Sequence, residues 1–173
     1  HLYVRENEWE AAQSVWVWLD RSTSMQYHSE DGLPDKADRA AVLMLALSSL
    51  LIRGGERITL LGSGIAPSNG RAVMDRLVAS IAVQGTEEQS APPLEQLPRY
   101  ARVVMISDFL TPPTEIEKTL RGFASVGVRG HLLQVFDPAE QSLPFAGRVR
   151  FEGLEGEGAA LIGRVEAVRT EYI

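Results

Sequence analysis

One stretch near the N-terminus, residues 15–25, places the strongest constraint on the fold. Its first five residues, 15–19, form an uninterrupted apolar run that is β-branched or aromatic except for Leu19. Such a run is typical of a strand that is buried on both faces, as the central strand of a parallel sheet is. Because a strand of that kind needs helices on either side of its sheet, the stretch predicts an α/β fold.

Oxygen-bearing side chains follow this run at every second position, as Asp20, Ser22 and Ser24. In a loop that leaves a strand, residues two apart tend to project to the same side, so one carboxylate and two hydroxyls can converge just beyond the strand end. This is a ligand set for a hard, oxygen-preferring cation such as magnesium. The alternative is an Asx or Ser turn that only caps the next helix.

Apolar runs alternate with helical patterns along the rest of the chain. We expect helices over 36–53, 69–83 and 112–126, and strands over 58–61, 103–106 and 132–136, followed by a strand or hairpin over 148–152 and 159–162 and a short terminal helix. This order predicts a three-layer α-β-α fold with a doubly wound, mostly parallel sheet and right-handed crossovers. In such folds the ligand site lies beyond the carboxyl ends of the strands, where the strand order reverses.

Length and composition indicate one globular domain over residues 1–173, in which residues 1–13 form an extended lead-in. The chain begins with His1 and not Met, so we expect an N-terminal region to be missing. The formal net charge of −6 argues against binding to nucleic acid or to an anionic membrane surface. No uncharged run is longer than residues 40–52, which would span ~20 Å as a helix, too short for a hydrocarbon core of ~30 Å. The absence of cysteine fits the cytoplasm.

The pattern Asp20-x-Ser22-x-Ser24, directly after an apolar strand and followed by Met25, resembles the metal-ion-dependent adhesion site of von Willebrand factor type A domains. Within that superfamily, residues 4–10 and 106–110 resemble a bacterial family catalogued as domain of unknown function 58, and the resemblance covers essentially the whole chain. It implies that the first apolar strand lies beside the strand over 103–106. Asp20 and Asp108 would then meet at the switch point.

The resemblance also implies how this site would hold its ion. Ser22 and Ser24 would bind one divalent cation, Mg or Mn, directly, and Asp20 and Asp108 would bind it largely through water. A third loop should supply a threonine, for which Thr86 is the first candidate and Thr111 the competing one. An open coordination position would remain, which a Glu or Asp of a protein partner fills in the family. Asp108 could also be a helix N-cap, and capping is compatible with metal binding.

Enzyme motifs were tested against their own requirements and do not fit. A haloacid dehalogenase-type phosphatase needs a second Asp where Ser22 stands, and neither a P-loop nor a Gly-x-Ser-x-Gly motif occurs. We therefore expect a non-enzymatic, magnesium-dependent protein-interaction module, and the resemblance implies a MoxR-type AAA ATPase as its partner in protein maturation or assembly. The alternatives are a magnesium-dependent hydrolase that activates water and a metal-free scaffold.

Overall fold

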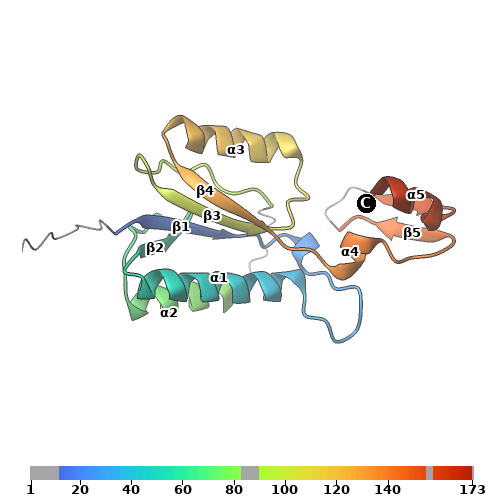
Figure 1. Cartoon of the computed structure of the whole chain (residues 1–173), viewed down its shortest axis with the longest axis horizontal. Coiled ribbons are helices and arrows are strands. Elements are labelled where there is room, and N and C mark those ends of the chain that lie inside the picture. The colour runs from blue at the N-terminus through green and yellow to red at the C-terminus, as the bar shows by residue number, and fades with distance from the viewer. Residues whose placement is uncertain (1–11, 83–89, 155–157, 173) are drawn as a thin grey trace, which may run out of the picture.

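The computed structural model describes residues 12–82, 90–154 and 158–172, so the expected lead-in over 1–13 lies almost wholly outside the described residues. Its main sheet has four parallel strands in the order β2-β1-β3-β4 (Figure 1). The strand bounds are β1 Ser14–Leu19, β2 Arg57–Leu60, β3 Arg102–Ser107 and β4 Arg129–Gln134. The expected pairing of the first and third apolar strands is confirmed, because Trp16 pairs with Val103 and Trp18 with Met105.

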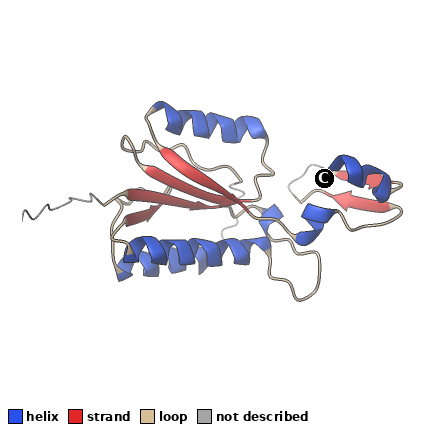
Figure 2. Ribbon diagram, in the orientation of Figure 1, coloured by secondary structure: helices blue, strands red, loops and turns tan. Residues whose placement is uncertain are grey.

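Helices cover both faces of this sheet, which confirms the three-layer α-β-α fold (Figure 2). Helices α1, Lys36–Arg53, and α2, Arg71–Ala82, lie on one face, and α3, Pro113–Ser125, lies on the other. A short 3-10 helix, η1, Thr23–Met25, follows β1 directly. The second helix begins two residues later than expected because Gly70 adopts a φ of +98°, a left-handed conformation that does not belong to a helix.

Strand β1 supplies side chains to both layers of the core. Val15 and Val17 belong to the cluster under α1 and α2, together with Met44 of α1 and Leu77 of α2. The two tryptophans, Trp16 and Trp18, pack on the opposite face with Phe123 of α3 and its neighbours. Successive residues of a strand point to opposite faces, so an apolar run without alternation fits only a strand that is covered on both sides.

The edge strand β4 differs from the prediction. We expected a strand over 132–136, whereas pairing with β3 starts it at Arg129 and ends it at Gln134. Gly130 explains the close approach of the two strands, since a Cβ atom there would lie 2.2 Å from the Val103 carbonyl oxygen. Apolar character was a poor guide here because Leu132 and Phe136 are both exposed.

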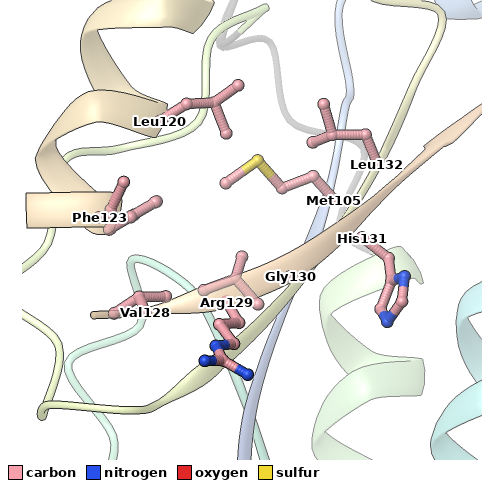
Figure 3. A pocket seen from close by; sticks show the side chains of 10 residues that line it. Met105, Leu120, Phe123, Val128, Arg129, Gly130, His131 and Leu132 are labelled. Carbon is pink, nitrogen blue, oxygen red and sulfur yellow. The ribbon is translucent and has the colours of Figure 1, made fainter. Parts of the chain in front are cut away.

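Below α3, a cavity of about 290 Å³ lies against strands β3 and β4. Met105, Leu120, Phe123 and Leu132 line it, and Figure 3 shows that His131 points away from these side chains. The side chains of β4 therefore divide between the two faces, as the strand period requires.

The last part of the chain forms a separate small layer, which we call the C-terminal unit, residues 138–172. It contains α4 Pro138–Ser142, the antiparallel strands β5 Val149–Glu152 and β6 Ala159–Ile162, and α5 Val165–Tyr172. The expected hairpin and terminal helix are confirmed, and the unit lies beyond the carboxyl ends of the main strands (Figure 1). No helix in the described ranges combines the length and the apolar character that a membrane span needs.

A candidate metal site at the carboxyl ends of β1 and β3

The two aspartates of the predicted site lie at the ends of neighbouring strands. Asp20 directly follows β1 and Asp108 directly follows β3, and the Asp20 amide donates to the Ile106 carbonyl across the pair at 2.9 Å. Both residues are buried, at 1% and 2% exposure. Strand β2 lies on one side of β1 and β3 on the other, so this is the switch point where α/β folds place their ligands.

The Asp20 carboxylate is held by neutral donors. The Ser22 backbone N–H donates to Oδ1 at 2.8 Å, and the Ser107 hydroxyl donates to Oδ2. Burial raises the pKa of the Asp20 carboxyl and the charge of Asp108 adds to that rise, while the hydrogen bonds from Ser107 and Ser22 act against it. The folded chain thus disfavours the Asp20 negative charge.

The two hydroxyls of the motif come together as predicted. The Ser22 and Ser24 Oγ atoms lie 3.0 Å apart and both residues are buried. The segment is not extended, because the Met25 amide donates to the Ser22 carbonyl at 3.1 Å and closes the turn of η1. Met25 is fully buried in the core under α1 and anchors this turn.

Asp108 is held by a buried cation that the sequence analysis missed. The Lys36 Nζ donates to Asp108 Oδ2 at 2.8 Å and to Glu140 Oε1 at 2.5 Å. Burial acts to lower the pKa of Lys36. The hydrogen bonds and charges of Asp108 and Glu140 outweigh this effect and raise that pKa above its usual value. Lys36, at 3% exposure, therefore stays charged and balances two carboxylates from distant parts of the chain.

The sequence carries a signal for this lysine. Lys36 and Lys118 are the two lysines of the chain, and Lys36 is the first residue of α1. A cation at a helix N-terminus opposes the helix dipole, so its presence there indicates a nearby anion. Asp35, the residue directly before this helix, makes no side-chain capping bond and pairs instead with His28.

Asp108 itself is not a helix N-cap. Its Oδ1 accepts from the Leu110 amide at 3.2 Å, whereas α3 begins only at Pro113. Phe109 adopts a φ of +56°, in the left-handed region that favours glycine. Its side chain packs against the tryptophan cluster below the loop, which offsets an uncommon backbone conformation.

Two threonines, Thr86 and Thr111, are the candidates for the third-loop ligand. Thr86 lies outside the described residues. Thr111, the competing candidate, is buried and its hydroxyl donates to the Ser90 carbonyl at 2.7 Å. That bond leaves the Thr111 oxygen available only as an acceptor.

A third buried carboxylate, Asp137, follows β4. Its Oδ1 accepts from the Ala139 amide at 2.8 Å, and its Oδ2 accepts from the Ser29 amide at 3.0 Å. Together with Glu140 it forms a capping box for α4, so this Asp-Pro pair starts a helix rather than forming a simple turn.

The donor chemistry at the switch point fits a divalent cation. Two buried carboxylates and two adjacent hydroxyls supply hard oxygen atoms, although no group of three or more acidic or histidine side chains gathers in the described part of the chain. Each carboxylate oxygen named above already accepts one hydrogen bond, which suits contact through water better than direct contact. Ser22 and Ser24 would hold an ion directly, and Asp20 and Asp108 would orient its water.

Comparison with known proteins gives a family match. Residues 1–173 match the family described as "Protein of unknown function DUF58". Among solved structures, an aerotolerance-related membrane protein from Bacteroides fragilis NCTC 9343, with multiple mutations to serines, is 21% identical with a TM-score of 0.49. That alignment covers 93% of this chain and 86% of the other. No curated protein matches the chain.

Proposed function

Because the chain belongs to the DUF58 family, whose description assigns no activity, we infer its function from the site and propose that it is a magnesium-dependent protein-interaction module. The ion, Mg or Mn in its place, would be held at Ser22 and Ser24. When bound, it supplies an electrophilic centre that accepts one more anionic oxygen. A glutamate or aspartate of a protein partner would provide that oxygen and so complete the coordination.

The observation that carries this proposal is a pair of hydroxyls beside two buried carboxylates. The two carboxylates differ in whether a cation balances their charge. Ser22 and Ser24 are neutral, so they do not quench the charge of an ion. Asp108 is already paired with Lys36, whereas the donors to Asp20 among the described residues, Ser22 and Ser107, are neutral. A divalent ion would therefore meet one carboxylate that these residues do not neutralise, and would keep the electrophilic character that attracts a partner's carboxylate.

The proposal also covers the partner protein and the cellular compartment. By resemblance, we propose a MoxR-type AAA ATPase as the partner, with the pair acting in maturation or assembly of other proteins. The role is non-enzymatic, and the ion bridges two proteins. A chain without cysteine suits a reducing compartment, so we place this interaction in the cytoplasm.

The test is the melting temperature of the protein with chelator and with millimolar magnesium, for the wild type and for Asp20→Asn. A ligand that binds only the native state stabilises it by ~2.7 kcal/mol at a hundredfold excess over its dissociation constant. We expect magnesium to raise the wild-type melting temperature and to leave Asp20→Asn unchanged. The matched control is Asp75→Asn, which changes an exposed aspartate of α2 and should respond like the wild type.

An equal magnesium response in the wild type and in Asp20→Asn would contradict the proposal, because the ion would then bind elsewhere. Ser22→Ala and Ser24→Ala supply a second arm, since each removes one hydroxyl and leaves both carboxylates in place. Each should weaken the response to magnesium, measured as the difference between the melting temperatures of the same variant in magnesium and in chelator.

A further inference from the structure

A groove of about 470 Å³ runs from the candidate metal site to the C-terminal unit. We call it the hairpin groove. Its inner end is formed by Ser24 and Lys36, and its walls come from α4, the β5 strand and the end of α5. The larger apolar and aromatic side chains that line it include Leu110, Leu143, Phe145, Phe151 and Tyr172.

The apolar walls of this groove are built by the chain itself. The Phe145 and Phe151 rings meet edge to face with centroids 5.5 Å apart. Arg169 of α5 fixes the segment below them, because its guanidinium donates to the Leu143 and Phe145 carbonyls at 2.9 and 2.7 Å. This fixed aromatic pair and an exposed leucine, Leu110 at 57% exposure, line the same groove, which suits it to receive one anchoring side chain.

The charges along the groove indicate what kind of anchor it takes. Lys36 and Arg150 are balanced by Glu140 and Glu152, their ion-pair partners on the same walls. The lining formed by the described residues is therefore close to neutral, and a divalent ion at Ser24 would make its inner end positive. The complementary occupant is anionic at that end and apolar further along.

We propose that the hairpin groove docks the segment of the partner protein that carries the metal-binding carboxylate, with an aliphatic or aromatic side chain close to that carboxylate seated against Leu110 and the Phe145–Phe151 pair. The inference rests on the proposed function and adds a sequence preference to it. An acidic residue alone is not sufficient for the partner; it needs a bulky apolar neighbour. Hydrophobic burial then supplies affinity that a single contact between a carboxylate and the ion does not.

The experiment is the selection of random short peptides, displayed on phage, on the immobilised full chain in millimolar magnesium. We expect the enriched peptides to carry Asp or Glu within a few positions of Leu, Ile, Met, Phe or Trp. The most enriched peptide, synthesised with a fluorescent label, is then titrated by fluorescence polarisation. Its affinity should fall about tenfold or more for Leu110→Ser and for Phe151→Ala, and it should also fall in chelator.

Leu50→Ser is the matched control, since Leu50 is a similarly exposed leucine on α1 and does not line the groove. It should bind the peptide like the wild type. Because Leu110 is exposed, its replacement by serine leaves the buried core intact, so loss of binding by that variant reports on the groove rather than on folding.

The outcomes separate the two proposals. Magnesium-dependent binding that survives both Leu110→Ser and Phe151→Ala would overturn the groove and leave the proposed function standing. Binding that these variants abolish but chelator does not affect would support an apolar groove and overturn the metal dependence. If the selection does not enrich peptides with an acidic and an apolar residue, the proposed occupant of the groove is wrong. Self-association of the wild type that Leu110→Ser prevents would also contradict it, because the occupant would then be a second copy of the chain.

Discussion

The two buried aspartates of the site differ in what balances their charge. Asp20 and Asp108 follow neighbouring strands and are equally inaccessible, yet the donors to Asp20 among the described residues are neutral, namely the Ser22 backbone N–H and the Ser22 and Ser107 hydroxyls. Asp108 accepts from the ammonium of Lys36. Burial of a carboxylate is costly unless a positive charge compensates it. Within the described part of the chain, Asp108 therefore has a counter-ion in Lys36, whereas Asp20 is held by neutral hydrogen-bond donors.

The largest expected effect comes from removing the internal counter-ion. Lys36→Met leaves Asp108 buried and uncompensated, and breaking a buried ion pair from one side typically costs about 3–5 kcal/mol. We expect a loss of that size in the free energy of unfolding, measured by urea denaturation. The matched control is Lys118→Met, which removes an exposed lysine of α3 and should change the unfolding free energy by less than about 0.5 kcal/mol. Equal losses of unfolding free energy in Lys36→Met and Lys118→Met would contradict the role of Lys36 as the counter-ion of Asp108.

Neutralising the carboxylate of the pair should have a smaller effect. In Asp108→Asn the ammonium of Lys36 keeps Glu140 as a partner, so one charged hydrogen bond is lost and the ion is not stranded. Such a bond contributes about 1.5–3 kcal/mol. Urea denaturation should place this variant between Lys36→Met and the wild type, and a loss as large as that of Lys36→Met would mean that Glu140 does not hold the lysine.

Neutralising the other carboxylate should cost little. The raised pKa of Asp20 means that the folded state disfavours its charge, so at neutral pH the charge lowers stability. In chelator, the unfolding free energy of Asp20→Asn should therefore be equal to or higher than that of the wild type, measured by urea denaturation. A clear loss of stability in chelator would show that the Asp20 charge already has a compensating partner in the chain.

The smallest effect concerns pH and the third buried carboxylate. Burial acts to raise the pKa of Asp137, but hydrogen bonds from Ser29 and Ala139 and the charge of Lys36 lower it overall. A depressed folded-state pKa stabilises the protein at pH values above the unfolded-state pKa, and this contribution is lost as the pH falls through the folded-state value. The urea midpoint of the wild type should thus fall more between pH 6 and pH 3 than that of Asp137→Asn, which keeps a capping side chain. Parallel pH profiles would contradict this assignment.

The sequence predicted the Asp20 half of the site better than the Asp108 half. Ser22 and Ser24 are close to Asp20 in the chain, so strand and turn geometry alone brings them together. The place of Asp108 required the order of the strands, which only the resemblance provided. The contact between Lys36 and Glu140 joins residues 104 positions apart, and no periodic pattern encodes such a contact.

The limits of prediction for the fold have a similar physical cause. Strand β1 is covered on both faces, so its composition is nearly uniform and its bounds were predicted to within a residue. Strand β4 lies at an edge, and five of its six residues are exposed. Its bounds follow from hydrogen bonding to β3 and from the fit of Gly130, and neither leaves an apolar signature.

The ion pair between Lys36 and Glu140 also bears on how the molecule can be divided. A shorter polypeptide that ends after β4 would retain every strand of the main sheet and all three large helices. It would nevertheless lack Glu140 and Ala139, which line the groove around Lys36, and would open a buried ammonium to water. The boundary between the sheet and the C-terminal unit therefore passes through the candidate site. As a result, a fragment that preserves the site must be longer than one that preserves the sheet alone.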